Sequence, residues 1–327
     1  MLEGRTHYVE ALGIREVREA IARKVRRING IRAEVEDVAF MPDKYALAAV
    51  LQALVNRGGE VLVPDPGYFY SEPVILAGVR PVMYRLAEDF SLDLDEIRSR
   101  MNGRTRAIVV NSPANPTARV FRRRNLEELY ELARERGVRI VSDEAYEDII
   151  FEGQHFSPGS LEDSPEHVIS VFSLSKSFSM TGWRAGYLVA SRRLLSLVSK
   201  YVEHTMSCLP PFIEVAAAHA LDNQERLVAP IREECSRRRK IVVDALRDID
   251  HLEVNPIEGT FYAFPRYDLE IGSVKLAERL LRERRVAVVP GIGFGPSGEG
   301  RFRISFCQRE DELVRGLEGL RGFFGAR

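Results

Sequence analysis

Short apolar runs alternate with longer amphipathic segments along most of this sequence. The runs Glu60–Val63, Ala107–Val110 and Val138–Val141 have the length of buried strands, and another run passes through Val171. Segments such as Asn125–Gly137 carry apolar residues every three to four positions, which predicts helices between the strands. Strands that alternate with helices predict an α/β fold, with a mostly parallel sheet sandwiched by helices.

Polar residues follow three of these predicted strands. Asn115, Asp143 and Lys176 each come shortly after a different apolar run. The carboxyl ends of parallel strands lie at one edge of a sheet, where ligands bind. We therefore expect these three side chains to share one site. A dinucleotide site is not expected, because no G-x-G-x-x-G string follows the first strand and Gly291–Gly295 comes too late.

Composition narrows the class of protein. The 327 residues carry a net charge of −1, so no bulk electrostatic attraction to nucleic acid or to an anionic membrane is expected. The three cysteines are far apart and odd in number, which argues for a reducing compartment. Histidine spacing indicates no metal site, and no apolar stretch or leader predicts membrane insertion or export. We expect a cytoplasmic protein without a metal.

Lys176 stands in an unusual setting for a lysine. It lies between Ser173 and Ser175 on one side and Arg184 on the other, directly after an apolar run. A lysine amine can form a Schiff base with an aldehyde when its surroundings tune its pKa. Hydroxyl groups and a guanidinium nearby suit a phosphate. From the spacing alone, a lysine that caps a loop is an equal alternative.

Longer strings around these residues resemble a known family. S-x-S-K-x-x-x-M-x-G-W-R-x-G-Y, at Ser173–Tyr187, resembles the lysine motif of the class I and II aminotransferases, which are fold type I enzymes that use pyridoxal 5′-phosphate (PLP). Asn111–Ala118 resembles the family string N-x-P-x-N-P-T-G. Ala118 replaces its last glycine, so we expect either a negative φ or strain there. The resemblance implies a large PLP-binding domain over residues 1–205, then connecting helices and a small C-terminal αβ domain over 206–327.

The resemblance implies catalytic roles at the matching positions. Lys176 would hold PLP as a Schiff base and act as the general base on the substrate. Asp143 would keep the ring nitrogen protonated, and Tyr146 and Asn115 would hydrogen-bond the ring oxygen. Arg303, in R-F-R-I-S-F, would bind the substrate α-carboxylate beside Asn115, since a guanidinium holds a carboxylate by two parallel hydrogen bonds. An arginine on the polar face of a strand is the alternative at that position.

Further cofactor contacts are implied in the same way. Tyr68 matches the aromatic residue that stacks on the ring, and Ser173, Ser175 and Arg184 match contacts to the phosphate. Tyr8 matches a tyrosine that reaches the phosphate of the neighbouring subunit, which implies a homodimer; a packing aromatic in a turn is the alternative. Family members also carry an N-terminal arm that closes over the substrate. The sequence begins after that arm, so we expect weak transamination with high KM values.

The segment at Asp43 and Lys44 departs from the family pattern. The family has glycine and small polar residues there, before a helix that we predict over Tyr45–Asn56. Asp43 is the predicted N-cap, and the backbone amides of Asp43 and Lys44 are expected to bind the phosphate. The Asp43 carboxylate would repel a phosphate unless it turns back to cap the helix.

The implied function is a PLP-dependent aminotransferase. Such an enzyme moves an amino group between an α-amino acid and a 2-oxo acid. Two alternatives stay open, because the cofactor motifs are shared: a PLP-dependent lyase or decarboxylase, and a PLP-binding regulatory protein without turnover. The sequence does not indicate which side chain the substrate carries.

Overall fold

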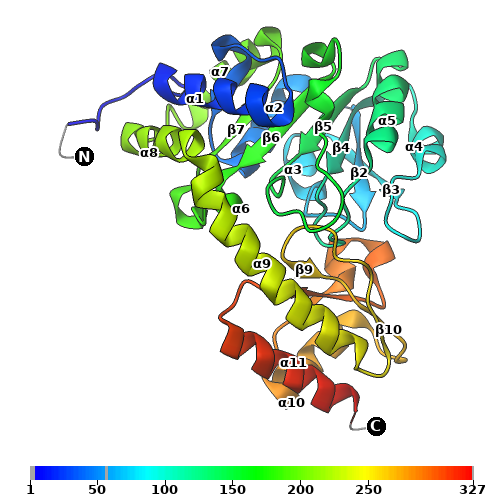
Figure 1. Cartoon of the computed structure of the whole chain (residues 1–327). Coiled ribbons are helices and arrows are strands. Elements are labelled where there is room, and N and C mark those ends of the chain that lie inside the picture. Colours follow the sequence, from blue (N-terminus) through cyan, green and yellow to red (C-terminus); the bar gives the residue numbers. More distant parts are fainter. Residues whose placement is uncertain (1–3, 56–57, 326–327) are drawn as a thin grey trace.

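A seven-stranded sheet and the helices that cover it form the larger part of the molecule (Figure 1). The computed structural model describes residues 4–55 and 58–325. The strand order is β1-β7-β6-β5-β4-β2-β3. The strands are β1 Val38–Phe40, β2 Glu60–Asp65, β3 Arg80–Arg85, β4 Thr105–Asn111, β5 Arg139–Asp143, β6 Val168–Ser173 and β7 Gly186–Val189. All pairs from β6 to β3 are parallel, while β7 runs antiparallel to both β6 and β1. The predicted mostly parallel sheet is confirmed.

Successive residues of the central strands point to opposite faces of the sheet, and both faces are buried. In β4, Ala107 and Val109 belong to one apolar core, while Ile108 and Val110 belong to another. This two-residue period explains why the strands are apolar throughout rather than alternating. The helices that cover the first face are α2 Asp43–Leu54, α3 Ser71–Leu76 and α7 Arg192–Thr205.

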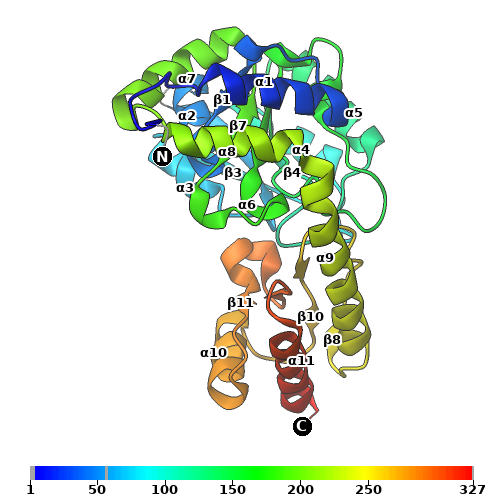
Figure 2. The ribbon, with the colours of Figure 1, turned by 60° about the vertical axis from the view of Figure 1, so that its left-hand side comes forward.

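The opposite face is covered in two parts (Figure 2). The covering helices are α4 Leu94–Arg100 and α5 Arg123–Glu135 on one part, and α1 Arg15–Lys24 and α8 Pro211–Asp222 on the other. Val17 and Ile21 of α1 pack with Ala217 and Leu221 of α8 over β1, β6 and β7. The C-terminal half of the chain therefore contributes a helix to the core of the large sheet.

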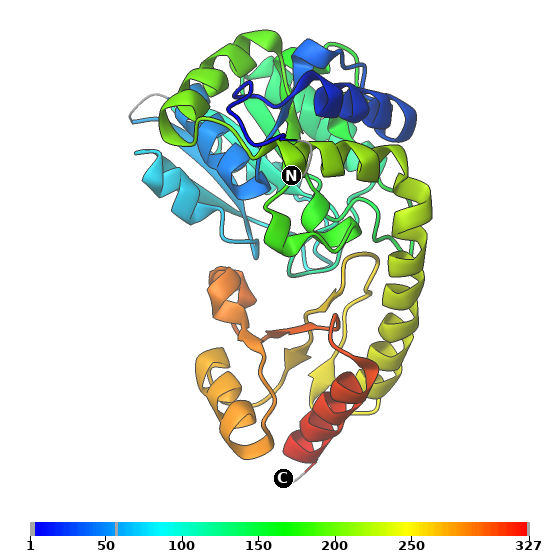
Figure 3. The same ribbon diagram turned by 90° about the vertical axis from the view of Figure 1, so that its left-hand side faces the viewer.

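A smaller αβ unit lies at the other end of the long helix α9, Gln224–Arg247 (Figures 1 and 3). Val242 and Leu246 of α9 belong to a separate core with Phe302 and Phe324. Its other elements are β8 Leu252–Glu253, β9 Tyr262–Ala263, β10 Arg266–Tyr267, α10 Ser273–Arg284, β11 Val289–Pro290, β12 Phe302–Ser305 and α11 Glu310–Phe324. The boundary predicted at residue 205 stays a prediction, and residues 1–3 and 326–327 lie outside the described residues.

Two local expectations can be compared with the backbone. The predicted N-cap at Asp43 is wrong: helix α2 starts at Asp43 itself, after Pro42 in an extended conformation, so the Asp43 side chain is already inside the first turn. The predicted end at Asn56 lies outside the described residues. Ala118 has φ +59°, so the chain adopts the left-handed conformation there without a glycine, at a cost on the order of 1 kcal/mol.

Within residues 4–55 and 58–325, no helix combines the length and the apolar character needed to cross a bilayer. In the same ranges, His, Cys, Asp and Glu side chains do not gather in groups of three or more that could hold a metal ion.

Candidate active site

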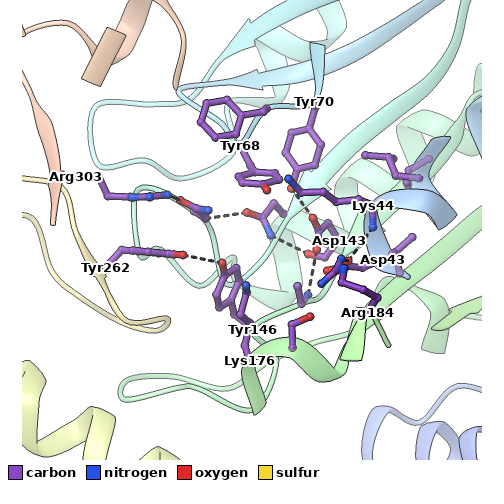
Figure 4. A pocket seen from close by; sticks show the side chains of 18 residues that line it. Asp43, Lys44, Tyr68, Tyr70, Asp143, Tyr146, Lys176, Arg184, Tyr262 and Arg303 are labelled. Atoms are coloured by element: carbon purple, nitrogen blue, oxygen red, sulfur yellow. Dashed lines mark hydrogen bonds and ion pairs between the residues drawn. The ribbon is translucent and has the colours of Figure 1, made fainter. Parts of the chain in front are cut away.

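A cavity of about 590 Å³ lies at the carboxyl ends of the central strands and reaches the smaller unit (Figure 4). Asn111 and Asp143, the last residues of β4 and β5, are paired in the sheet register and both line it. Most of the predicted site residues line this one cavity: Asp43, Lys44, Tyr68, Asn115, Asp143, Tyr146, Ser175, Lys176, Arg184 and Arg303. Ser173 and Tyr8 do not.

Asn111 fixes the loop that carries Asn115. Its side-chain amide donates to the Asp143 carbonyl oxygen at 3.0 Å, and its Oδ1 accepts from the Asn115 backbone N–H at 2.8 Å. One residue thus joins the ends of two neighbouring strands to the loop after β4. Asn115 is buried, and it lines the same cavity as Asp143.

Asp143 is held by two hydrogen bonds in a half-buried position. The Tyr70 hydroxyl donates to its Oδ2 at 2.7 Å, and the Ala145 backbone N–H donates to its Oδ1 at 3.1 Å. Burial raises the pKa of Asp143 to about 6; the Tyr70 hydrogen bond opposes this rise, and the nearby Asp43 carboxylate adds to it. A cation bound next to Asp143 would restore its ionised form, because an opposite charge lowers a carboxyl pKa.

Lys176 lies on the short helix α6, Leu174–Ser177, which directly follows β6. Among the residues that the structure describes, its amine has no hydrogen bond or ion pair. Ser173 starts α6: its hydroxyl accepts from the Ser175 N–H at 3.2 Å, so Ser173 acts here as a helix cap. The Ser175 hydroxyl itself is buried and has no partner among the described residues.

Arg303 enters the cavity from β12 of the smaller unit and is fixed on three sides (Figure 4). Its guanidinium lies over the Tyr262 ring at 4.3 Å and over the Phe294 ring at 4.9 Å. Its Nη1 donates to Asn115 Oδ1 at 2.9 Å, while the buried Nε has no partner in the described part of the chain. Nε and Nη2 lie on one edge of the guanidinium, and their N–H groups make no hydrogen bond in the described part of the chain, so this edge has unused donors for a carboxylate.

Aromatic hydroxyls and a lysine complete the walls. The Tyr146 and Tyr262 hydroxyls lie 3.1 Å apart, and burial raises the pKa of both, well above the ordinary value for Tyr146. Both are therefore neutral hydrogen-bonding groups near neutral pH. The exposed Lys44 amine lies 5.2 Å from the centre of the Tyr68 ring.

The end of the cavity near α2 holds the groups expected to bind a phosphate. Arg184 Nη1 donates to the Thr181 carbonyl at 2.8 Å, and its Nη2 lies 3.5 Å from Asp43 Oδ1. Asp43 Oδ1 also accepts from the Lys44 backbone N–H at 2.8 Å. The Lys44 amide, which we expected to be available for phosphate, is thus engaged by the Asp43 side chain.

Sequence reasoning missed Tyr70, Tyr262, Asn111 and Phe294. Tyr70 follows Tyr68 in the string Y-F-Y, where alternation would place both on one side of an extended segment. Tyr262 lies in the string G-T-F-Y-A-F, whose cluster of aromatic residues was a usable signal. Nothing in the sequence indicated Asn111 as a strand-end clamp or Phe294 as a stacking partner.

Tyr8 lies apart from these residues in the segment before α1. Its side chain is 88% exposed, so it has no place in the cavity of its own chain. A role in a neighbouring subunit stays a prediction.

Comparison with known proteins agrees with this arrangement. The family model "Aminotransferase class I and II" matches residues 1–320. This chain belongs to the class I and II aminotransferases. An aspartate aminotransferase of Pyrococcus abyssi is 37% identical over 326 residues, covering 97% of this chain and 84% of that protein. An aromatic-amino-acid aminotransferase of Thermococcus litoralis is 35% identical, with 97% and 84% covered.

Solved structures match equally well. A crystal structure of an aromatic aminotransferase from Pyrococcus horikoshii superposes with a TM-score of 0.97 at 37% identity, covering 99% of this chain and 89% of that one. The predicted family and fold type I architecture are therefore confirmed, and the chain is a PLP-dependent aminotransferase.

The residues of the cavity fit PLP. An amine without a partner among the described residues, that of Lys176, suits an aldehyde, and the buried Ser175 hydroxyl lies in the same cavity as Arg184. Asp143 is a carboxyl whose ionised form an adjacent cation would stabilise, and it therefore suits a protonated ring nitrogen. These residues therefore suit the three parts of PLP, namely its ring nitrogen, its aldehyde and its phosphate.

Proposed function

We propose that Lys176 carries the cofactor and moves the substrate proton, with Asp143 and Arg303 as its main partners in amino transfer. The observation that carries this proposal is that Lys176 lines the same cavity as Asp143 and Arg303, and that its amine makes no hydrogen bond or ion pair with the described residues. A lysine amine without an ion pair can alternate between attachment and proton transfer, whereas a paired one could not.

Asp143 sets the electronic state of the site. When bound, PLP supplies an aldehyde that condenses with amines and a ring that withdraws electrons from the substrate Cα. Asp143 favours that chemistry by holding positive charge at the ring nitrogen. Tyr70 and the Ala145 amide keep the carboxylate in position. Tyr146 and Asn115 are the proposed donors to the ring oxygen, and Tyr68 is the proposed stacking partner.

Arg303 orients the substrate. Its Nε and Nη2, which make no hydrogen bond among the described residues, would donate two parallel hydrogen bonds to the α-carboxylate of an amino acid or a 2-oxo acid. Tyr262 and Phe294 limit the movement of the guanidinium, so the bound substrate keeps one orientation relative to Lys176. Lys176 can then reach the same face of the substrate in both directions of the transfer.

Ser175, Arg184 and the first amides of α2 are the proposed phosphate contacts. Ser173 contributes through the cap that positions Ser175. The exposed Tyr8 supports a homodimer in which this side chain completes the partner's site. Relatives carry names that include aspartate and aromatic amino acids, so we propose a screen over acidic, aromatic and small amino acids to define the accepted side chain.

Cofactor attachment can be tested directly. The protein incubated with PLP should be yellow, and borohydride reduction should fix the cofactor on the peptide that contains Lys176. Lys176→Ala should abolish the fixed adduct, while Lys240→Ala, at an exposed position of α9, should not. A reduced adduct on another residue in Lys176→Ala would refute the assignment.

A further inference from the structure

The phosphate end of the cavity contains a carboxylate among its donors. Asp43, the first residue of α2, lines the cavity together with Ser175 and Arg184 (Figure 4). Its Oδ1 accepts from the Lys44 N–H at 2.8 Å and lies 3.5 Å from Arg184 Nη2. One backbone amide and one guanidinium that a phosphate would use are thus already engaged by a side chain of this chain.

The backbone at Asp43 lies directly against the neighbouring strand. Strand β7 begins at Gly186, whose lack of a side chain lets it lie directly against the start of α2. A Cβ on Gly186 would lie 3.0 Å from the Asp43 nitrogen and 2.7 Å from the Phe172 carbonyl oxygen. Helix α2 is therefore closely packed against β7 at this end, and rotation of the Asp43 side chain would free both the Lys44 amide and Arg184.

Other groups nearby indicate that an anion belongs at this position. Ser175 is 3% exposed and lines the same cavity, and its buried hydroxyl has no partner among the described residues. The amide of Asp43 itself belongs to the first turn of a twelve-residue helix, where no earlier turn can accept from it. These donors suit a phosphate, whereas the Asp43 carboxylate opposes one.

We propose that Asp43 competes with the cofactor phosphate: its carboxylate holds Arg184 and the Lys44 amide in the cofactor-free protein, and a phosphate must displace it. The inference rests on the proposed function, in which this end of the cavity binds PLP. Two like charges about 5 Å apart at a half-exposed site change an affinity on the order of tenfold. A neutral residue at position 43 should therefore bind phosphate compounds about tenfold more tightly.

The test compares ligands with and without a phosphate. Cofactor-free wild type and Asp43→Asn are titrated with PLP and with pyridoxal, which has the same ring and aldehyde but no phosphate. The Kd for PLP should fall about tenfold in the variant, while the Kd for pyridoxal stays within about twofold. Inorganic phosphate should compete with PLP more strongly in the variant by a similar factor. A merely structural effect of the substitution would change both ligands alike.

A matched control separates loss of charge from loss of this carboxylate. Asp222 is an exposed carboxylate paired with Arg23 at 2.9 Å, outside the cavity. Asp222→Asn should leave all three affinities unchanged. If Asp43→Asn does not fold by circular dichroism, Asp43→Ser takes its place with the same expected results.

Two results would overturn the inference. An unchanged Kd for PLP in the variant would mean that Asp43 does not compete, and weaker binding would mean that it helps to hold the phosphate. Failure of the proposed function is a different result: wild type would then bind neither PLP nor pyridoxal. In that case calorimetry with inorganic phosphate alone still decides the matter, since Asp43→Asn must bind it more tightly than wild type.

Discussion

Replacing Asp143 by asparagine should stabilise the cofactor-free protein, and the gain should depend on pH. Burial raises the pKa of this carboxyl from 3.8 to about 6. Between these values the folded state holds a proton that the unfolded chain has released. Wild-type stability therefore contains a contribution that is present at acid pH and lost as the pH rises through about 6. An amide side chain does not titrate in this range, so Asp143→Asn removes this dependence.

The size of the effect follows from the shift. A difference of about two pKa units corresponds to about 3 kcal/mol at full ionisation. The carboxyl is half-buried and borders an open cavity, so solvent screening reduces the expected difference between about pH 4.5 and pH 7.5 to about 1 to 2 kcal/mol. For a chain of 327 residues this is a change in Tm of about 1.5 to 3 °C.

Thermal unfolding of the cofactor-free wild type and Asp143→Asn at the two pH values gives the difference in Tm between the two proteins, and how that difference changes with pH. The advantage of Asp143→Asn over wild type should be larger at about pH 7.5 than at about pH 4.5. The exposed Asp222→Asn serves as the control and should show no such change. An advantage that is equal at both pH values, or a variant that is less stable at the higher one, would refute the reasoning. In the PLP-loaded enzyme the same substitution should slow proton removal by several kcal/mol, about the cost of losing a principal electrostatic partner.

Two further predictions rest on single contacts, and a third concerns the assembly of the chain. Lys24 is 1% exposed and paired with the buried Glu147, so Lys24→Met should lower the free energy of unfolding by about 3 to 5 kcal/mol, seen as a lower Tm. Lys240→Met, at an exposed position, is the control and should change the stability little. Arg303→Lys should raise KM for amino acids about tenfold to a hundredfold with a smaller change in kcat, because a lysine cannot make two parallel hydrogen bonds to a carboxylate. Arg301 donates to Asn255 instead, so Arg301→Lys is the matched control. Equal effects of the two substitutions would contradict the assignment of Arg303. Sedimentation equilibrium should give twice the chain mass of 37.0 kDa, and a fully active monomer would exclude the proposed dimer.

The main features of the fold were predictable because they depend on local patterns. Apolar runs of strand length between amphipathic segments indicated the mostly parallel sheet, although they did not indicate its strand order. The antiparallel β7 was not predicted, since a strand's direction depends on the path of the chain through the Lys176 loop. The N-cap of α2 was also predicted wrongly. Asp43 is a good cap by residue type, but the helix already begins at Asp43, and the residue in the N-cap position is Pro42.

The candidate site was predictable where a residue follows a strand and carries distinctive chemistry. Lys176, Asp143 and Asn115 meet both conditions, and they line one cavity. Tyr70 meets neither: its contact with Asp143 joins positions 73 residues apart, and an aromatic residue in a loop is typical of ordinary packing. The engagement of the Lys44 amide by Asp43 also required coordinates, because only side-chain orientation distinguishes a cap from a competitor.

The most direct test of the account follows the amino nitrogen through one turnover. The PLP-loaded protein is mixed with an amino acid labelled with nitrogen-15, without any 2-oxo acid, and the products are analysed by mass spectrometry. We predict that the label moves to the cofactor and that one 2-oxo acid is released per site, in the wild type but not in Lys176→Ala. Release of the label as ammonia, or of carbon dioxide, with an unlabelled cofactor would contradict amino transfer by this site.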